Sequence, residues 1–581
     1  MTIAALKIFR FTTWGRQVAA ALAGVCLALA FPKANVAGLA WVAPALFVTV
    51  ALGTSGWQTF RIGYVAGLAH YLTSLSWLLH IPVHGYPILG WIALSAFLAL
   101  FPAAWVWLSL KAQSSDNSDG SDGNTWTKRA VWALTGAASW VALDILLARV
   151  LGGFPWNFLG ASQYQLLPLI QIASGTGVYG VTFLVVWTSL ALFNAVVAII
   201  RQPTNRHAWL GEIILPATAL AVVFALGMRT LREPAEISGA LRVTMIQPSI
   251  PQTMIWDARE NSNRFRQLIE QTTCALTNPT ELVIWPEAAV PGVLRFDEVT
   301  QLTVTNLARS NGVWLILGSD DAALRPGGKT EEDVDYFNAS FLVSPSGEVV
   351  AGYRKRHLVM FGEFIPFTRW LPFVKWFTPI TAGFTPGTRV VPFRLERRSP
   401  TRRADDSDSQ PAGPEAGAPI KTATLICFED VFPHLVREYV ESDTDFLVNL
   451  TNDGWFGESS AQWQHAASAV FRAVENGVPL LRCCNNGLTC WVDERGRIRE
   501  VLDDANGGVY GPGVLGVRLP LRSAESRTPP TFYNRHGDWF GWGCVGLTVL
   551  MLAVQARRGP GREDAGPALD VPPPDGGARR P

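Results

Sequence analysis

The sequence predicts a protein of two parts, a polytopic α-helical membrane domain and an α/β domain held outside the cytoplasm. Three observations lead to this prediction. Of 581 residues, 49% are hydrophobic and only 16% are charged, which is too apolar for an ordinary soluble protein and too charged for membrane helices alone. Long apolar runs fill the first part of the chain and return once near its end. Between them, residues 241–520 carry short β-rich runs.

Eight apolar runs are long enough, or nearly so, to span a bilayer. They lie at about 17–31, 36–53, 61–80, 87–110, 130–150, 177–200, 208–228 and 539–556. The first run follows three basic residues and ends in Ala28-Leu29-Ala30, so it also fits a cleavable signal peptide. We therefore predict an N-terminal membrane domain over 1–228, with about seven helices, and a closing transmembrane helix over 536–556.

The distribution of Lys and Arg sets the orientation of these spans. If the N-terminus is cytoplasmic, the short outer segments carry only Lys33 and Arg149. The inner ones then carry Lys7, Arg10, Arg16, Arg61, Lys111, Lys128, Arg129, Arg201, Arg206, Arg557, Arg558 and Arg562. Because positive residues favour the cytoplasmic side, both termini are predicted to be cytoplasmic and residues 229–535 extracytoplasmic.

Composition also excludes several classes of function. A net charge of +1 without a basic patch gives no reason to expect a nucleic-acid partner. The seven cysteines are odd in number and contain no C-x-x-C pair, so neither a disulfide framework nor a zinc site is expected. We see no phosphate-binding or dinucleotide fingerprint and expect no cofactor. Low-complexity composition predicts a disordered insert at about 397–419 and a disordered cytoplasmic tail at 557–581.

The extracytoplasmic region alternates strand-like runs with helical or loop segments. Most runs are continuously apolar, as expected for strands that are covered on both faces, so a layered α/β domain is predicted. The runs are LRVTMIQ, ELVIWPE, VWLILGS, ASFLVSP, TATLICFE, DFLVNLTND and PLLRCCNNG.

Three strand ends carry residues with chemical function. Glu287 ends ELVIWPE and Cys427 lies at the end of TATLICFE, while Lys355 and Glu363 follow a further run in VVAGYRKRHLVMFGEFIP. Taken singly, Glu287 could begin a helix, Lys355 could lie in a solvated turn, and Cys427 could be a small core residue. Taken together they supply a base, a cation and a nucleophile, which is the set that nucleophilic acyl transfer requires.

The order of these motifs carries a family resemblance. W-P-E is followed by Y-x-K-x-H-L-V-x-F-G-E, by I-C-F-E-D, by LTNDGWFG at 450–457 and by RAVENGVPLLRCCNNG at 472–487. This set resembles the nitrilase, or carbon-nitrogen hydrolase, superfamily. With the preceding spans, the segment GFPWNFLGASQ at 153–163 and the closing span, nearly the whole chain resembles its membrane-embedded apolipoprotein N-acyltransferase family.

The resemblance implies an αββα sandwich and a triad of Glu287, Lys355 and Cys427. It also implies transfer of a fatty acyl chain from the sn-1 position of a phospholipid, typically phosphatidylethanolamine, to a cysteine thioester. The acceptor would be the α-amine of the diacylglyceryl-cysteine of an apolipoprotein, in the last step of lipoprotein maturation. The expected location is the bacterial inner membrane, with the catalytic domain periplasmic.

Chemistry gives each triad residue a role. Cys427 attacks as a thiolate, whose pKa a neighbouring Lys355 ammonium would lower. Glu287 takes and returns protons in both half-reactions. Lys355 and the backbone N–H of Phe428 would stabilise the oxyanion.

Further residues receive supporting roles. Glu363 and Glu429 could orient Lys355 or assist proton transfer, although each could equally be a structural partner of an arginine. Four residues are predicted to bind substrate or line its entrance, with Trp256 otherwise an ordinary packed side chain. They are Trp256, Phe361, Asn452 and Trp455.

Three other functions compete with acyl transfer. A membrane-tethered amidase could use the same triad, because water can attack a thioester as an amine does. A transporter or scaffold with a lipid-binding domain would not need an activated thiol. A papain-like enzyme would pair Cys427 with His434 or His465. Met360, where the family motif has proline, and Phe428, where it often has tyrosine, place the loop details in question.

Overall fold

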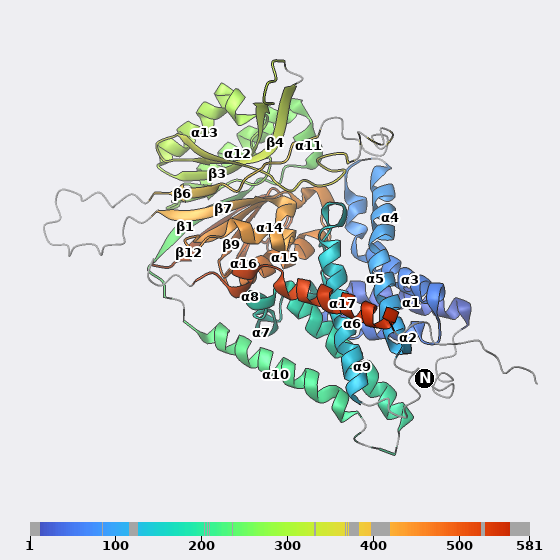
Figure 1. Ribbon diagram of the computed structural model, residues 1–581. Helices are drawn as coiled ribbons and strands as arrows, with labels where there is room; N and C mark the ends of the chain where they lie inside the picture. The colour runs from blue at the N-terminus through green and yellow to red at the C-terminus, as the bar shows by residue number, and fades with distance from the viewer. Residues whose placement is uncertain are drawn as a thin grey trace, which may run out of the picture.

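The computed structural model describes residues 12–557 apart from 84, 116–125, 203, 206, 208, 235, 331–332, 367, 369, 371–372, 374–382, 397–418 and 524–528. The helical part and the β-rich part form two adjoining bodies (Figure 1). The predicted insert at 397–419, except for its last residue, lies outside the described residues, as does the tail after Arg557.

Each of the eight predicted spans contains a helix. Five helices are long and apolar enough to cross a membrane: Tyr86–Ala112, Trp126–Leu147, Val178–Arg201, Leu210–Arg232 and Trp539–Arg557, with Thr13–Leu29 a shorter apolar helix. The predicted span at 36–53 is broken into a 3₁₀ turn, Ala37–Trp41, and the nine-residue helix α2, Ala43–Ala51. The total of about eight spans therefore stays a prediction.

The main helices of this part are α1 (Thr13–Leu29), α2, α3 (Gly56–Ser74), α4 (Tyr86–Leu98), α5 (Leu100–Ser115), α6 (Trp126–Leu147), α9 (Val178–Arg201), α10 (Leu210–Arg232) and α17 (Trp539–Arg557). Shorter helices are α7 (Leu167–Ile170), α8 (Ala173–Thr176), α11 (Gln252–Trp256), α14 (Pro433–Val436) and α16 (Phe532–His536).

Small residues let α1, α3 and α5 approach closely. A Cβ at Gly24 of α1 would lie 2.0 Å from the carbonyl oxygen of Ala66 in α3. A Cβ at Gly63 of α3 would lie 2.8 Å from the Cα of Ala103 in α5. Close backbone packing of this kind is how helices associate where lipid supplies no hydrophobic driving force. Helix α1 is thus packed tightly into the bundle.

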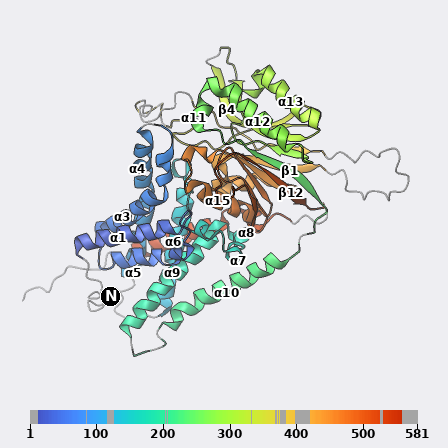
Figure 2. The ribbon, with the colours of Figure 1, turned by 180° about the vertical axis from the view of Figure 1, so that it is seen from behind.

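Helix α10 packs against α9 and α7 and ends beside the β-rich part (Figures 1 and 2). Its last turn is held by the β-rich part: Arg495 and Arg497 donate to the carbonyl oxygen of Leu231 at 3.3 and 2.8 Å. Cations at the C-terminal end of a helix also interact favourably with its dipole. Helix α10 therefore connects the helical part to the first strand, β1.

Two six-stranded sheets form the β-rich part. The first has the order β12-β1-β2-β3-β4-β5 and the second β11-β10-β9-β8-β7-β6. Strands β1, β2 and β3 run parallel, as do β7, β8 and β9. Every predicted run contains a strand, including the run before Lys355, which is β5, whereas β6, β10, β11 and β12 were not predicted. The bounds are β1 Gly239–Gln247, β2 Leu282–Ile284, β3 Trp314–Leu324, β4 Val334–Val343, β5 Val349–Arg354, β6 Pro392–Leu395, β7 Ile420–Ile426, β8 Phe446–Thr451, β9 Leu480–Cys484, β10 Cys490–Val492, β11 Ile498–Val501 and β12 Gly513–Leu521.

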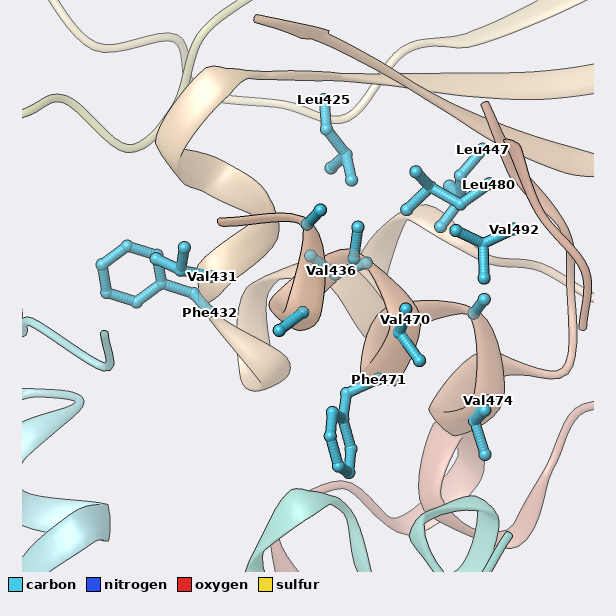
Figure 3. Packing of buried hydrophobic residues seen from close by; sticks show 14 of the residues in the cluster. Leu425, Val431, Phe432, Val436, Leu447, Val470, Phe471, Val474, Leu480 and Val492 are labelled. Atoms are coloured by element: carbon cyan, nitrogen blue, oxygen red, sulfur yellow. The ribbon is translucent and has the colours of Figure 1, made fainter. Parts of the chain in front are cut away.

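Helices cover the outer face of each sheet, so the layers are αββα (Figure 1). Helices α12 (Asn261–Ala275) and α13 (Glu298–Asn311) cover the first sheet, and α15 (Ala461–Asn476) covers the second. Figure 3 shows Val470 and Val474 of α15 facing Leu447, Leu480 and Val492 of the sheet. All residues of α15 except Trp463 are buried, because its other side lies against the helical part.

One side chain of α15, Gln464, makes several hydrogen bonds between the two parts. The Gln464 oxygen accepts from the indole N–H groups of Trp77 and Trp156 at 3.1 and 2.9 Å, and from the amide of Asn157 at 3.3 Å. Its nitrogen donates to the carbonyl oxygens of Pro32 and Ser74 at 2.7 and 3.2 Å. All these partners belong to the helical part, so Gln464 fixes the position of the sandwich relative to the helices.

Candidate active site

The three predicted strand ends meet at one edge of the sandwich. Strand β2 ends at Ile284, and Glu287 follows after a further ladder bond from Trp285 to Ile316. Strand β5 ends at Arg354, and the next residue, Lys355, donates its backbone N–H to the Asn338 carbonyl at 2.8 Å. Strand β7 ends at Ile426, directly before Cys427.

Glu287, Lys355 and Glu363 form one buried group of charges. The Lys355 ammonium lies 2.8 Å from Glu363 Oε1 and 3.5 Å from Glu287 Oε1. The amide of Asn338 donates to the same two oxygens, at 2.9 Å to Glu363 and 2.7 Å to Glu287. The second oxygen of Glu363 accepts from the backbone N–H of Val359 at 2.8 Å. The second oxygen of Glu287 is buried and has no hydrogen-bond partner among the described residues.

This group contains one cation and two carboxylates, and this excess of negative charge determines the direction in which each pKa is shifted. Burial would lower the pKa of Lys355, but the charges of Glu363 and Glu287 outweigh it and raise the pKa above the ordinary value. Burial, helped by the charge of Glu363, raises the pKa of Glu287 against the opposing effect of Lys355. Glu287 is therefore a stronger base than an exposed glutamate, and Lys355 stays protonated.

Cys427 sits on a strained turn. Its φ is 52°, in the left-handed region that few side chains other than glycine adopt, at the step from β7 into a 3₁₀ turn, Cys427–Val431. Its side chain is half-buried. Burial and the charge of Glu287 raise the pKa of the thiol, although Lys355 acts in the opposite direction. The expected lowering of the Cys427 pKa by Lys355 is thus present, but burial and Glu287 outweigh it. The resting side chain of Cys427 is therefore a thiol beside the Glu287 carboxylate.

Glu429 ties two catalytic strand ends together. One of its oxygens accepts from the backbone N–H groups of Arg356 and His357 at 2.7 and 3.1 Å, directly after Lys355. The other accepts from the N–H of Ile426 at 2.8 Å, directly before Cys427. The hydroxyl of Tyr353 donates to both oxygens. Glu429 therefore links the backbone beside Lys355 to the backbone beside Cys427, and none of these bonds comes from an arginine side chain.

A second, closed group of charges lies behind Cys427. His465 lies 2.7 Å from Asp430 and 2.9 Å from Asp453, and Arg482 contacts the same two carboxylates at 3.1 and 2.7 Å. All four side chains are buried. Because both ring nitrogens of His465 are occupied, the ring is not available to activate Cys427. This geometry argues against His465 as the partner in a papain-like pair.

Three of the four predicted substrate contacts are aromatic, and Phe428 follows Cys427 directly. Trp256 of α11 is 48% exposed and lies edge-on to Trp455, with ring centroids 5.1 Å apart. Phe361 is 45% exposed in the loop after Lys355. The Phe428 ring packs near Trp156 and Phe154 of the membrane part, with centroids 6.1 and 5.8 Å apart. Two predicted substrate contacts, Trp256 and Trp455, are therefore brought together.

Asn452 has a different environment from the other predicted substrate contacts. It is buried, its amide donates to Gln252 at 2.7 Å, and its oxygen accepts from Gly454 and Asn485, each at 3.1 Å. The side chain thus organises the loop after β8. Direct substrate binding by Asn452 stays a prediction.

Asn338, which binds Glu287 and Glu363, and Tyr353, which binds Glu429, were not identified from the sequence. Asn338 lies in the apolar run of β4, and Tyr353 was treated only as part of the Lys355 motif. A polar residue inside a buried strand is the signal that could have found Asn338, since such a group needs a partner. Within the described part of the chain, no three His, Cys, Asp or Glu side chains are grouped to hold a metal ion.

Comparisons with known families cover both parts of the chain. Residues 242–510 match the carbon-nitrogen hydrolase family. Residues 23–191 match the N-terminal domain of apolipoprotein N-acyltransferase.

Individual relatives cover nearly the whole chain. An apolipoprotein N-acyltransferase of Geobacter metallireducens is 34% identical over 93% of this chain and 95% of its own length. One from Bradyrhizobium diazoefficiens is 29% identical over 95% of this chain and 97% of its own. A solved amidase from Nesterenkonia sp. is 18% identical, with a TM-score of 0.33, and the match covers 50% of this chain and 93% of that chain.

Proposed function

The chain belongs to the apolipoprotein N-acyltransferase family, and from this membership we propose that it moves an acyl chain from a phospholipid to the α-amine of a diacylated apolipoprotein. The proposed donor position is sn-1 and the proposed donor is phosphatidylethanolamine. The proposed triad is Glu287, Lys355 and Cys427. The observation that carries the triad is the buried group of Glu287, Lys355 and Glu363 at the strand ends that deliver Cys427.

In the first half-reaction, the free oxygen of Glu287 takes the thiol proton as Cys427 attacks the ester carbonyl. The raised pKa of Glu287 favours this transfer. Lys355 stays cationic beside the developing oxyanion, and the N–H of Phe428 is the second proposed donor. When the carbon–oxygen bond breaks, Glu287 returns the proton to the departing glycerol oxygen, leaving an acyl thioester on Cys427.

In the second half-reaction, the acceptor amine attacks the thioester carbonyl. Glu287 takes a proton from the attacking nitrogen, the new amide bond forms, and the carbon–sulfur bond breaks. The proton then returns to Cys427 sulfur, so the enzyme is restored. Glu363 and Asn338 hold Lys355 and Glu287 in place throughout. Apolar residues around Cys427, including Phe428, limit access of water, which would otherwise hydrolyse the thioester.

The proposed location is the bacterial inner membrane, with the sandwich periplasmic and both termini cytoplasmic. The support is the excess of Lys and Arg in the segments assigned to the cytoplasm. The exposed Cys274 of α12 provides a test in a Cys427→Ser background. A membrane-impermeant maleimide should label Cys274 in intact spheroplasts. Labelling only after the membrane is opened would contradict this orientation.

The reaction can be tested by intact mass spectrometry of the purified full-length protein. After incubation with phosphatidylethanolamine, we expect one added acyl chain on Cys427, which hydroxylamine releases and a diacylated lipopeptide discharges. Cys427→Ser should carry no hydroxylamine-sensitive chain. Absence of an adduct on the wild type, or full transfer by Cys427→Ser, would contradict the proposal. Discharge by water at the rate seen with lipopeptide would favour the amidase alternative.

A further inference from the structure

Asp320 lies beside the proposed triad and has no role in the mechanism above. It belongs to β3, where it is paired directly with Asn338 of β4. Residues that face each other in an antiparallel pair point to the same face, with Cβ atoms about 5 Å apart. Asn338 is the residue whose amide binds both Glu287 and Glu363. Asp320 therefore adjoins the catalytic carboxylates on the side away from Lys355.

The structure gives Asp320 no partner of its own. The neighbouring Asp321 points to the opposite face, where Arg354 binds it at 2.8 Å and Arg295 lies 3.7 Å away. Asp320 is half-buried, and among the described residues its carboxylate forms no hydrogen bond or ion pair. The nearest cation that affects it, Arg264, donates instead to Ala288 O at 3.3 Å and Asn261 Oδ1 at 3.0 Å.

The charge around Asp320 is unbalanced. Glu287, Glu363 and Asp320 place three carboxylates beside two cations, Lys355 and Arg264, and among the described residues neither cation forms an ion pair with Asp320. Burial, together with the charges of Glu287 and Glu363, raises the pKa of Asp320 to about 7, although Arg264 acts in the opposite direction. A further cation with several N–H donors would relieve this repulsion and satisfy the free carboxylate. A primary ammonium group has that chemistry.

We propose that Asp320 receives the primary ammonium group of a substrate at the rim of the active site. This inference rests on the proposed function, in which two substrates carry such a group: the α-amine of the acceptor and the headgroup of phosphatidylethanolamine. Both are protonated in solution, and both must lie near the triad for reaction. Asp320 acts by binding and orienting that group. An acceptor bound as ammonium releases one proton to solvent before its free amine attacks, and Glu287 then takes the second proton, which returns to the Cys427 sulfur.

The experiment measures the two half-reactions separately in full-length Asp320→Asn, which keeps the size of the side chain. In the acceptor arm, preformed acyl-enzyme is discharged by increasing concentrations of diacylated lipopeptide. In the donor arm, acylation of Cys427 is followed with phosphatidylethanolamine and with phosphatidylglycerol, which lacks an amine. Asp335→Asn is the matched control, because Asp335 is a half-exposed acid of β4 whose partner is Arg325.

If the ammonium comes from the acceptor, Asp320→Asn should need about tenfold more lipopeptide for half-maximal discharge, with the saturated rate nearly unchanged. If it comes from the donor, acylation by phosphatidylethanolamine should fall about tenfold while acylation by phosphatidylglycerol is unchanged. In either case Asp320→Glu should restore part of the loss and Asp335→Asn should behave as wild type.

Two results would overturn the inference. Wild-type behaviour of Asp320→Asn in both arms would show that no substrate ammonium depends on it. An equal loss with both phospholipids and with saturating lipopeptide would indicate general damage to the site. A wild type that forms no adduct at all would instead remove the proposed function, and with it this inference.

Discussion

Two buried groups of charges lie close together in the sandwich, and they differ in balance. The open group consists of Lys355 with Glu287 and Glu363, one cation against two carboxylates. The closed group, described above, pairs His465 and Arg482 with Asp430 and Asp453, two potential cations against two carboxylates. The open group leaves one buried Glu287 oxygen without a partner, whereas both carboxylates of the closed group bind cations through both oxygens.

The two groups differ in function because they differ in charge balance: an unbalanced group can be reactive, whereas a balanced group supports the structure. A carboxylate with an unoccupied oxygen and an excess of negative charge around it can exchange protons with a neighbouring thiol. A charge-balanced group with every carboxylate bound holds its side chains in one arrangement. The closed group joins the Cys427 turn to the loop after β8, since Asp430 lies within the turn and Asp453 follows β8. It is therefore expected to support the turn on which the open group acts.

The largest expected effect comes from removing the base of the open group. Glu287→Gln keeps the shape and the acceptor oxygen for Asn338 but cannot take the thiol proton. We expect acylation of Cys427 to slow by about 10³- to 10⁴-fold, since that is the upper range for general acid–base catalysis. The measurement is the rate of adduct formation with phosphatidylethanolamine, followed by intact mass.

Glu363→Gln is the matched control for Glu287→Gln. It changes the other carboxylate that contacts Lys355 but leaves the proposed base intact. We expect a loss of about 10- to 100-fold, because Lys355 would lose an anionic partner and Val359 an acceptor. If Glu363→Gln were as slow as Glu287→Gln, the assignment of Glu287 as the sole base would be wrong.

In the closed group, a substitution is expected to change the free energy of unfolding. Arg482→Met leaves two buried aspartates with only His465 between them, and loss of one partner from a buried ion pair typically costs about 3 kcal/mol or more. Lys355→Met should cost less, because Glu287 and Glu363 can share a proton. Urea unfolding of the full-length protein in detergent, followed by tryptophan fluorescence, compares the two. Equal losses of stability would remove the distinction drawn between the groups.

The closed group should also make stability depend on pH. Burial and Arg482 lower the pKa of His465, but Asp430 and Asp453 outweigh them and raise it above 6.5. Its stabilisation is therefore complete below pH 6.5 and is lost as the pH rises through the folded pKa. The neutral ring has one N–H, so one aspartate loses a donor. We expect the free energy of unfolding to fall by about 1.4 kcal/mol for each unit by which the pKa of His465 is raised.

His465→Gln tests this pH dependence, because it has no group that titrates in that range. Urea unfolding from pH 6 to pH 9 should show wild-type stability falling more steeply than that of the variant. Parallel profiles would show that His465 does not titrate in this window in the folded protein.

Most of the open group could be predicted from the sequence, and the closed group could not. Glu287, Lys355 and Cys427 each follow an apolar run, and strand ends on one edge of parallel sheets come together. Asp430 and Asp453 also follow such runs, but nothing in the local pattern tells a reactive acid from a supporting one. Their partners His465 and Arg482 come from α15 and β9, so pairing depends on tertiary packing.

Two further features of the protein could not be predicted from the sequence. The apolar run at 36–53 predicted a full span, but Pro44 lies in the first turn of α2 and the helix ends after nine residues. The raised pKa of Cys427 depends on how deeply the thiol is buried and how near Glu287 lies, and spacing along the chain reports neither.

The smallest expected effect concerns the link between the catalytic strand ends. Tyr353→Phe removes one donor to Glu429, which keeps the backbone N–H groups of Ile426, Arg356 and His357. We expect a loss of about 1 kcal/mol in unfolding free energy and a fall of a few-fold in acylation rate. Tyr336→Phe, on an exposed side chain of β4, should change neither. Glu429→Gln should cost more, because its amide would meet a backbone N–H at one oxygen position. If Tyr353→Phe cost as much as Glu429→Gln, the hydroxyl and not the backbone contacts would be what positions Lys355 relative to Cys427.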